Sequence, residues 1–434
     1  MKNWLNIVKS GKKNVLNSLK KSEKQFEFEV PSSAYVHIPF CRRRCYYCDF
    51  PVSVVGDRAT GSTSGTIAQY VEVLCQEIAI TPAPNSSLET VFFGGGTPSL
   101  LSVEQLERIL ATLEKYIGIA AQAEISMEID PGTFSRQQIQ GYRNAGVTRI
   151  SLGVQAFQDE LLTACGRSHQ LKDILAAIDL ICQVEVPDFS LDLISGLPHQ
   201  TLEQWHASLE AAINLAPTHI SCYDLTVEPI TAFGRQYTPG NKPLPTEDAT
   251  AQMYRLAQQV LTHAGYKHYE ISNYALPSHQ CRHNRVYWEN RPFYGFGMGA
   301  ASYLRGQRFT RARTRREYYA WVQQLVEVGG ILDYPKLSDT DVLLETLMLG
   351  LRLAEGLSLS TLQEQFGAKT LELLWKSLQP YYQDGWVEVR GTDEKIVHLE
   401  AAQKLPMTGR VRLSDPEGFL FSNTVLSDLF NKLG

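Results

Sequence analysis

The chain has 434 residues, of which 44% are hydrophobic and 20% charged, so it is long enough for two or three globular domains. Its formal net charge of −5 gives no basic footprint for nucleic acid, and no apolar run approaches the ~20 residues that cross a bilayer. Eight cysteines are too few for a disulfide scaffold at this length, which favours a reducing, cytoplasmic compartment.

Residues 1–30 form a basic N-terminal tail. Residues 1–24 contain seven lysines against one acid, Glu23, with apolar residues near helical spacing. This pattern is compatible with an amphipathic helix on a membrane surface or a partner, and less well with an organelle import signal, because arginine is absent. A frayed basic tail is the interpretation that we favour.

Three cysteines follow the first predicted strand, residues 35–38. Cys41, Cys45 and Cys48 have C-x3-C-x2-C spacing within one short loop. Three thiolates on one loop can bind three corners of a four-iron cubane cluster and leave the fourth iron open. A structural zinc site is the alternative, and His37 is the nearest residue for its fourth ligand. A disulfide fits less well because it leaves one cysteine of the three unpaired.

The whole loop resembles a known family. C-x3-C-x2-C with an aromatic residue, Tyr47, before the last cysteine is similar to the radical S-adenosylmethionine (SAM) superfamily. The sequence Y-x-H-I-P-F-C, which begins at Tyr35, resembles its group of coproporphyrinogen III dehydrogenases and HemW-like haem chaperones. The resemblance implies a 4Fe-4S cluster on the three cysteines, with the amine and carboxylate of SAM on the open iron. Reductive cleavage of SAM would then give a 5'-deoxyadenosyl radical, and Tyr35 and Tyr47 are candidates for contacts with SAM.

Short β-branched or aromatic runs alternate with helical segments in the first half of the chain. They predict six strands, at residues 35–38, 90–93, 124–129, 149–153, 188–193 and 219–224. Helix starts between them carry capping boxes, formed by Ser102 with Gln105, Ser135 with Gln138 and Thr201 with Gln204. Repeated strand–helix–strand units predict an α/β fold, in which six parallel units suit a partial (β/α)6 barrel over residues 31–245. An open doubly wound sheet is the alternative.

A glycine-rich turn follows the second predicted strand, at the carboxyl end where parallel α/β proteins build their sites. It contains Gly95, Gly96 and Thr97. Glycine lets backbone amides approach a ligand closely, although a tight turn between strand and helix would need the same residues. The family resemblance implies that this turn holds the methionyl amino group of SAM.

Polar residues also follow the next three predicted strands. The third strand ends with Glu128 and Asp130, the fourth is followed by Gln155 and Arg167, and the fifth carries Asp192. By resemblance, Glu128, Gln155, Arg167 and Asp192 surround the methionine and ribose of SAM, with Asp192 on the ribose hydroxyls. A carboxylate accepts well from hydroxyl groups, and a guanidinium binds a carboxylate through two hydrogen bonds. Each residue alone could be a helix cap or a surface residue, but together they favour a shared ligand.

Residues 246–330 are predicted to extend the barrel, and they begin with a helix at 247–264. They also contain the motif H-N-x-x-Y-W, from His283 to Trp288, which resembles the haem-chaperone branch of the family. Histidine is a common axial ligand of haem iron, and aromatic rings provide flat apolar surface for a macrocycle. His283 is therefore a candidate haem ligand, with a hydrogen-bonded structural histidine as the alternative.

Six arginines crowd residues 305–316. They would either bind the propionates of a tetrapyrrole or line a solvated edge strand, and we favour the solvated strand. Residues 331–434 are predicted to be helix-rich, with strand-like runs at 386–389 and 396–399. They resemble the winged-helix-like, HemN-type C-terminal domain of the same family, and we expect them to shape or cover the substrate side.

Two absences separate the branches of the family. Coproporphyrinogen III dehydrogenases typically extend the loop to C-x2-C-x-C, whereas this chain has Phe50 two residues after Cys48, and its tail does not match their N-terminal segment. Together with H-N-x-x-Y-W, these absences favour a haem chaperone that binds the 4Fe-4S cluster, SAM and haem. Its expected partners are haem-accepting proteins, membrane-bound ones included, and a reductant protein. The radical SAM decarboxylase is the alternative function, and a structural metal module is the third.

Overall fold

A computed structural model describes residues 30–57, 60–83, 86–331, 333–400 and 404–434. Two compact units contain them, residues 30–336 and residues 337–434. Of the predicted basic tail, residues 1–30, residues 1–29 lie outside the described residues. Within the described ranges, no helix combines the length and the hydropathy that a bilayer crossing requires.

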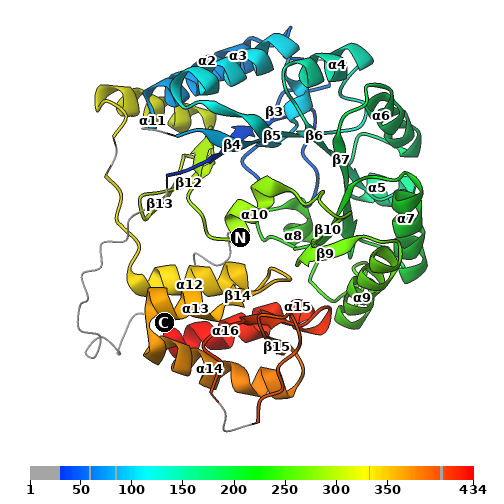
Figure 1. The fold of residues 1–434 in the computed structure, drawn as a ribbon. Coiled ribbons are helices and arrows are strands. Elements are labelled where there is room, and N and C mark those ends of the chain that lie inside the picture. Colours follow the sequence, from blue (N-terminus) through cyan, green and yellow to red (C-terminus); the bar gives the residue numbers. More distant parts are fainter. Residues whose placement is uncertain (1–29, 58–59, 84–85, 332, 401–403) are drawn as a thin grey trace. The chain divides into compact units, whose positions relative to one another are not determined.

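A nine-stranded sheet runs through the unit of residues 30–336. Its strand order is β11-β1-β4-β5-β6-β7-β8-β10-β9, and it curls into an open barrel (Figure 1). The pairs from β1 to β8 are all parallel, which confirms the predicted α/β fold with a partial barrel. The six predicted strands correspond to β1 (Ser33–Ile38), β4 (Leu88–Gly95), β5 (Ile119–Ile129), β6 (Arg149–Gln155), β7 (Asp188–Ser195) and β8 (His219–Asp224).

Three strands at the edges of the sheet were not predicted. β11 (Tyr294–Phe296) pairs in parallel with β1, whereas β10 (Asn273–Ala275) pairs antiparallel with both β8 and β9 (Lys267–Glu270). Each has three or four residues, which is too short for a period of two to stand out in the sequence. Between β10 and β11 the chain forms α10 (Arg282–Trp288), which lies inside the curve of the sheet (Figure 1). This segment therefore links the two edges of the barrel.

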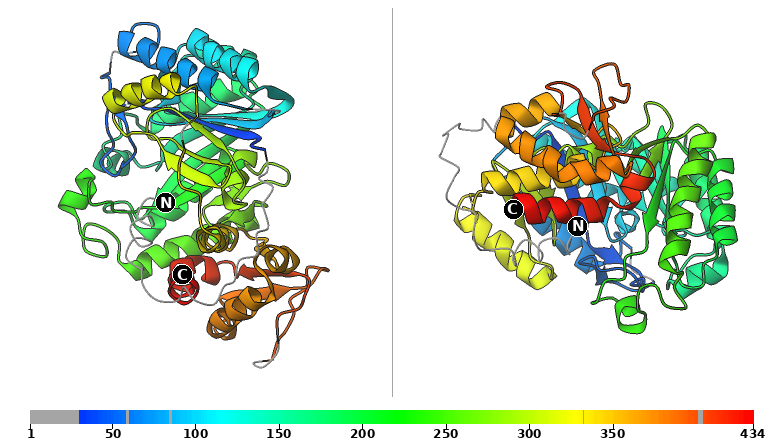
Figure 2. Two further views of the ribbon diagram at one scale, coloured as in Figure 1. Left: turned by 90° about the vertical axis from the view of Figure 1, so that its left-hand side faces the viewer. Right: turned by 90° about the horizontal axis from the view of Figure 1, so that it is seen from below.

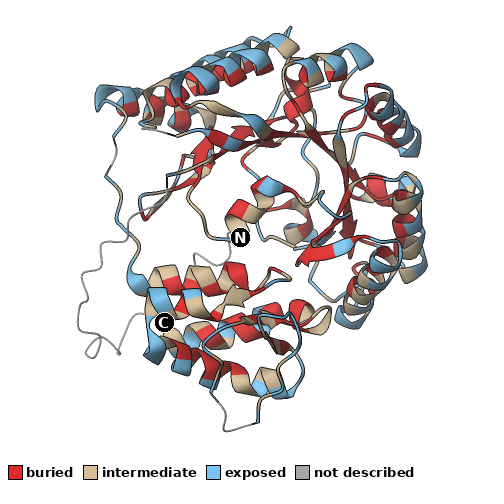
Figure 3. Ribbon diagram, in the orientation of Figure 1, coloured by how far each residue is buried: buried red, intermediate tan, exposed pale blue. Residues whose placement is uncertain are grey.

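Most helices of this unit line the outer, convex side of the sheet (Figure 2). Apolar side chains are buried between these helices and the strands, where the core lies (Figure 3). All three predicted capping boxes are present, with both hydrogen bonds formed in each. The helices are α2 (Gly65–Ile80), the 3-10 helix η1 (Pro98–Leu100), α3 (Val103–Tyr116), α4 (Arg136–Asn144), α5 (Asp159–Ala164), α6 (Leu171–Gln183), α7 (Leu202–Asn214), α8 (Ala232–Gln236), α9 (Glu247–His263), α10 and α11 (Arg315–Glu327).

The arginine-rich segment is only partly the solvated edge strand that its sequence predicts. β12 (Ala301–Leu304) and β13 (Gln307–Thr310) form a two-stranded hairpin. Arg311 follows this hairpin and is buried, because its Nε pairs with Glu77 of α2 at 2.7 Å. The two side chains are 3% and 0% exposed, so each supplies the counter-charge that burial of the other requires. For Arg311, the prediction of a solvated position was wrong.

The unit of residues 337–434 packs helices around a small antiparallel sheet with the order β14-β16-β15. The predicted run at 386–389 corresponds to β15 (Val387–Arg390). The predicted run at 396–399 is wrong, because β15 pairs with β16 (Arg410–Leu413) and residue 396 forms only an isolated bridge. Val411 of β16 is fully buried whereas Ile396 is 46% exposed, so burial selects β16. The other elements are α12 (Asp339–Gly350), β14 (Leu357–Ser358), α13 (Leu359–Phe366), α14 (Ala368–Gln383), α15 (Glu417–Leu420) and α16 (Ser422–Leu433).

Candidate functional site

The three cysteines lie on a short loop beyond the carboxyl end of β1. β2 (Phe40–Cys41) and β3 (Ser53–Val54) pair in parallel and close the loop at its base. The middle of the loop is held by Tyr46, whose N–H donates to the carbonyl of Cys165 at 3.0 Å. The carbonyl of Tyr46 accepts from the N–H of Phe233 at 3.0 Å. The loop is therefore anchored at its base and at its middle, to the segments that follow β6 and β8.

Cys41, Cys45 and Cys48 are free thiols of intermediate exposure. Burial, with a smaller contribution from the charge of Asp130, raises the pKa of Cys41 to about 12, and burial also raises the pKa of Cys48. A metal that binds these sulfurs must therefore displace their protons. Among the described residues, no three His, Cys, Asp or Glu side chains converge on one metal ion. A cubane binds each thiolate through a different iron, so it requires separated sulfurs.

His37, the residue suggested by its position as a fourth zinc ligand, is engaged elsewhere. Its Nδ1 lies 3.0 Å from the hydroxyl of Tyr35, and its Nε2 lies 3.0 Å from the carbonyl oxygen of Pro51. The contact of Nε2 links β1 to Pro51 at the end of the cysteine loop, whereas the contact of Nδ1 lies within β1. In this conformation His37 does not act as a metal ligand.

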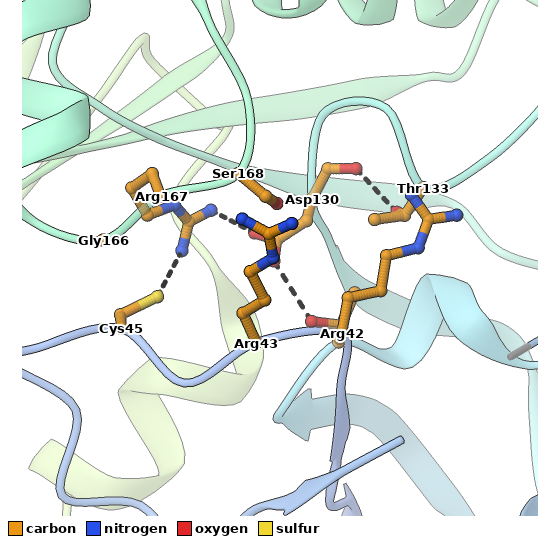
Figure 4. A pocket seen from close by; sticks show the side chains of 9 residues that line it. Arg42, Arg43, Cys45, Asp130, Thr133, Gly166, Arg167 and Ser168 are labelled. Carbon is orange, nitrogen blue, oxygen red and sulfur yellow. Dashed lines mark hydrogen bonds and ion pairs between the residues drawn. The ribbon is translucent and has the colours of Figure 1, made fainter. Parts of the chain in front are cut away.

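Arg167 and Asp130 form the centre of the polar group beside the cysteine loop (Figure 4). Arg167 Nη2 donates to Asp130 Oδ1 at 2.5 Å and to the carbonyl of Gly153 at 3.0 Å. Arg167 Nη1 lies 3.4 Å from both Cys45 Sγ and the Tyr47 hydroxyl. Burial alone would lower the pKa of Arg167, but the charges of Asp130 and Cys45 raise it, so the guanidinium stays charged. A positive charge thus lies where a thiolate has to form.

The glycine turn after β4 packs closely on β1. Gly95 has a φ of +112°, and a Cβ there would lie 2.3 Å from the His37 ring. A Cβ on Gly96 would lie 2.6 Å from the carbonyl oxygen of Phe40. Close packing against β1 therefore leaves no room for a side chain at either glycine. This agrees with the alternative that the segment is a tight turn between strand and helix. The turn also presents its amides to the site, since Gly95 N–H donates to Glu128 Oε2 at 2.9 Å.

Gln155 is the last residue of β6, and Asp192 lies in β7, three residues before the strand ends. Both carboxylate oxygens of Asp192 accept from the hydroxyl of Ser151, at 2.9 and 2.8 Å, and burial raises the pKa of Asp192. Gln155 is buried with a φ of 69°, next to a register shift between β6 and β7 that re-aims its side chain. A Cβ on Gly153 would lie 2.8 Å from Asp130 Oδ1 and 3.0 Å from Gln155 Nε2. The absence of a side chain at Gly153 therefore lets these groups come together.

The cavity beside Cys45 is small, about 20 Å³ in volume, and its lining includes Arg42, Asp130 and Arg167 (Figure 4). Thr97 also lines it. This volume suffices for about one water molecule, whereas sites for small-molecule ligands have about 300–1,000 Å³. A ligand as large as SAM therefore does not fit this cavity as it stands.

Asp130 is the site residue that the sequence analysis did not assign. Its Oδ1 accepts from Arg167 and its Oδ2 accepts from Thr97 Oγ1 at 3.1 Å, so it links the glycine turn to the segment after β6. The sequence signal that could have identified Asp130 is its position directly after the third predicted strand, two residues beyond Glu128. Both positions lie at the same strand end, and only the structure distinguishes their contacts.

His283 is fully buried on α10. Its Nδ1 lies 2.8 Å from Thr90 Oγ1 and its Nε2 lies 2.9 Å from the Tyr287 hydroxyl, while its ring stacks on Phe92. Glu124 accepts from the first two N–H groups of the helix, and burial lowers the pKa of His283 to about 3, so the ring is neutral. In this conformation both ring nitrogens of His283 hold hydrogen bonds inside the protein, which favours the alternative of a hydrogen-bonded structural histidine. The H-N-x-x-Y-W motif instead attaches α10 to β4 and β5.

We expect the variant His283→Ala to lose about 2–4 kcal/mol of unfolding free energy, because two buried hydrogen bonds and a stacked ring are removed. Urea denaturation followed by circular dichroism measures this loss. His206→Ala is the control, since His206 is 44% exposed on α7, and its stability should equal that of the wild type. A His283→Ala protein of wild-type stability that no longer binds haem would contradict the structural role.

Glu128 makes the stability of the fold depend on pH. Burial, followed by the charges of Asp192 and Asp130, raises its pKa from 4.5 to about 8. The folded state then binds this proton more tightly than the unfolded state, so the stabilisation is complete below about pH 4.5 and is lost as the pH rises to about 8. Because a single proton is involved, the unfolding free energy changes with pH by at most about 1.4 kcal/mol per pH unit, and this change is the slope of stability against pH. We expect Glu128→Gln to lose this slope in urea unfolding between those pH values, and an unchanged slope would contradict the assignment.

The chain matches two family models, the radical SAM superfamily over residues 35–212 and the HemN C-terminal domain over residues 337–393. It is 48% identical over 405 residues to the heme chaperone HemW of Synechocystis sp., which covers 93% of this chain and 97% of that protein. The chain belongs to the HemW family of radical SAM proteins. The heme chaperone HemW of Bacillus subtilis is 34% identical, over 86% of this chain and 96% of that protein.

Among solved structures, the coproporphyrinogen III oxidase HemN of Escherichia coli, a radical SAM enzyme, matches with a TM-score of 0.75. The sequence identity is 25%, and the match covers 93% of this chain and 90% of that chain. These comparisons confirm the family resemblance seen in the cysteine loop. Membership of the radical SAM superfamily implies a 4Fe-4S cluster and SAM as cofactors. The donor set fits the cluster, because three free thiols share one anchored loop beside the charged Arg167.

Proposed function

We propose that this member of the HemW family is a haem chaperone, which binds a 4Fe-4S cluster, SAM and haem and delivers the haem to acceptor proteins in the cytoplasm. The observation that carries the proposal is the 48% identity across 97% of a Synechocystis protein named heme chaperone HemW. The cysteine loop supports the proposal. Coproporphyrinogen III dehydrogenases typically have a further cysteine two residues after the last cysteine of the motif, and this chain has Phe50 there.

The cysteine loop is the proposed cluster site, with Cys41, Cys45 and Cys48 as the three ligands. The cluster would supply an open iron for the amine and carboxylate of SAM. Arg167 keeps a positive charge 3.4 Å from Cys45, which favours the thiolate and suits the carboxylate of an amino acid. Asp130 fixes this guanidinium through a 2.5 Å hydrogen bond. Its role is to position Arg167.

The remaining contacts to SAM are proposed from the strand ends. Glu128 and the amide turn of Gly95, Gly96 and Thr97 would receive the methionyl amine, because a carboxylate and backbone carbonyls accept from an ammonium group. Asp192 would accept from the ribose hydroxyls, since both of its oxygens already accept from a hydroxyl, that of Ser151. Gln155 would hydrogen-bond to the ligand through its buried amide, and the rings of Tyr35 and Tyr47 would pack against it.

A titration with haem tests the proposal. Anaerobically reconstituted protein is expected to give a Soret shift on addition of haem and to release no decarboxylated product from coproporphyrinogen III with SAM and a reductant. His283→Ala is expected to keep the Soret shift, since His283 holds its hydrogen bonds within the protein. Absence of haem binding contradicts the chaperone. Vinyl-bearing product would instead assign the decarboxylase, which the similarity to HemN favours as the second candidate.

A further inference from the structure

A fourth thiol lies next to the cysteine loop. Cys165 directly follows α5 and is fully buried. Its carbonyl accepts from the N–H of Tyr46 at 3.0 Å, and Tyr46 is the residue next to Cys45. With standard backbone bond lengths, this hydrogen bond keeps the α-carbons of Cys45 and Cys165 within about 8 Å of each other. Disulfides join α-carbons that are about 4.4–6.8 Å apart, so at most a small movement of the loop brings the pair into range.

The thiol of Cys45 points toward the segment that contains Cys165 (Figure 4). Its Sγ lies 3.4 Å from Arg167 Nη1, and Arg167 is two residues after Cys165. Gly166, between these two residues, packs on the loop, since a Cβ there would lie 3.0 Å from the Tyr46 ring. Burial, followed by the charge of Cys45, raises the pKa of Cys165 to about 12. The two thiols are therefore close enough to affect each other electrostatically.

The two sulfurs differ in their access to oxidants. Cys45 has intermediate exposure, and the guanidinium of Arg167 favours negative charge on its sulfur. Cys165 is buried, so solvent does not reach its thiol directly. An accessible thiolate is oxidised first, and a protected thiol beside it is suited to react with the product. Cys45 is thus the sulfur that an oxidant attacks, and Cys165 is the resolving thiol.

We propose that Cys45 and Cys165 form a reversible disulfide when the cluster-free protein meets a peroxide. The Cys45 thiolate attacks hydrogen peroxide and becomes a sulfenic acid, while hydroxide leaves. The Cys165 sulfur then attacks the sulfenic sulfur, the S–S bond forms, and the sulfenic oxygen leaves as water with the thiol proton. Overall, two thiols lose two electrons and two protons, and one hydrogen peroxide becomes two water molecules.

The disulfide preserves a proposed cluster ligand. This consequence rests on the proposed function, which places the cluster on Cys41, Cys45 and Cys48, whereas the disulfide itself needs only the two thiols. A sulfenic acid that finds no thiol is oxidised further to a sulfinic acid, which thiols do not reduce. A disulfide is opened again by thiols, so the cluster can be rebuilt on all three cysteines.

A competing pair lies within the loop itself. Cys45 and Cys48 have the C-x2-C spacing of many redox-active disulfides, and the N–H of Cys48 donates to the Cys45 carbonyl at 3.2 Å. The direction of the Cys45 thiol favours Cys165, because the thiol points out of the loop toward Arg167 (Figure 4). The two pairs give different cross-linked peptides, so one measurement separates them.

Peptide mapping of the full-length, cluster-free protein tests the proposal. The protein is treated with hydrogen peroxide in slight excess, alkylated, digested without reductant and analysed by mass spectrometry. We expect a peptide pair joined through Cys45 and Cys165 that dithiothreitol separates. Cys165→Ser should lose this cross-link and carry sulfinic acid at Cys45, and Cys165→Ala repeats the test if a buried hydroxyl disturbs the fold. Cys182→Ser is the matched control, because Cys182 is exposed on α6, and it should keep the cross-link.

Cluster reconstitution separates this proposal from the proposed function. Without peroxide, the wild type and the variants should bind equal amounts of iron and sulfide. After peroxide and then dithiothreitol, the wild type and Cys182→Ser should regain that amount, whereas Cys165→Ser should regain at least about fivefold less, because its Cys45 is over-oxidised. A wild type that assembles no cluster before any peroxide is added contradicts the proposed function but not the disulfide. A cross-link from Cys45 to Cys48, no cross-link at all, or equal recovery in all variants contradicts the disulfide proposal.

Discussion

Replacing Glu77 with glutamine is expected to lower the free energy of unfolding by about 3–5 kcal/mol. Glu77 is fully buried on α2, and its Oε1 accepts from Arg311 Nε at 2.7 Å. Its Oε2 accepts from the Tyr318 hydroxyl at 2.6 Å and from Gly297 N–H at 2.8 Å. Glutamine keeps the shape, but it leaves the charge of Arg311 without a counter-ion and directs an NH₂ group at one of these donors. Urea denaturation followed by circular dichroism measures the loss.

An exposed ion pair provides the control for Glu77→Gln. Asp57 pairs with Arg43 on the surface, and Asp57→Asn should leave the unfolding transition unchanged. The double variant Glu77→Met with Arg311→Met should be more stable than Glu77→Gln, because it buries neither charge. If the unfolding free energy of Glu77→Gln lies within about 1 kcal/mol of the wild-type value, Glu77 is not needed to balance the buried charge of Arg311.

Asp130→Asn is expected to weaken SAM binding about 10- to 100-fold. Asp130 holds Arg167 by a 2.5 Å hydrogen bond and accepts from Thr97 at 3.1 Å. A hydrogen bond between charged groups contributes about 1.5–3 kcal/mol, and 1.4 kcal/mol is a factor of ten in affinity. Asparagine has nearly the same shape as aspartate, so the fold and the iron content should not change. Anaerobic calorimetric titration with SAM measures the affinity.

Asp179→Asn is the matched control for Asp130→Asn. Asp179 is exposed on α6, away from the cysteine loop, and its replacement should leave the affinity for SAM unchanged. If Asp130→Asn binds SAM with the wild-type affinity, neither Asp130 nor its hydrogen bond to Arg167 contributes to the proposed SAM site. A loss of iron in that variant would mean that Asp130 supports the cluster rather than SAM.

The fold could be predicted where sequence patterns are long enough to repeat. β8 has the predicted bounds, residues 219–224, in a segment that contains the strand-favouring residues Ile220 and Tyr223 and whose first four residues are buried. β5 starts at Ile119, five residues earlier than predicted, because residues 120–123 include three alanines and look unlike a strand. β10 and β11 are defined by pairing with distant strands, β10 with β8 and β11 with β1, and no local pattern reports such pairing.

The site could be predicted only to the level of strand ends. Glu128 and Asp192 lie in β5 and β7, toward the carboxyl ends of these strands, and Arg167 follows β6, so the sequence places all three toward one edge of the sheet. Which of them contact one another depends on distances across the barrel. The hydrogen bond between Thr90 and His283 joins residues 193 positions apart, so no local pattern in the sequence could show that this histidine contacts β4.

The central claim is that Cys41, Cys45 and Cys48 hold a 4Fe-4S cluster whose open iron binds SAM. Electron paramagnetic resonance of the anaerobic, dithionite-reduced protein, recorded with and without SAM, tests it most directly. We predict a signal of a reduced 4Fe-4S cluster that changes when SAM is added and is absent from Cys45→Ser. Protein that contains no such cluster, or a cluster signal that SAM leaves unchanged, would contradict the claim.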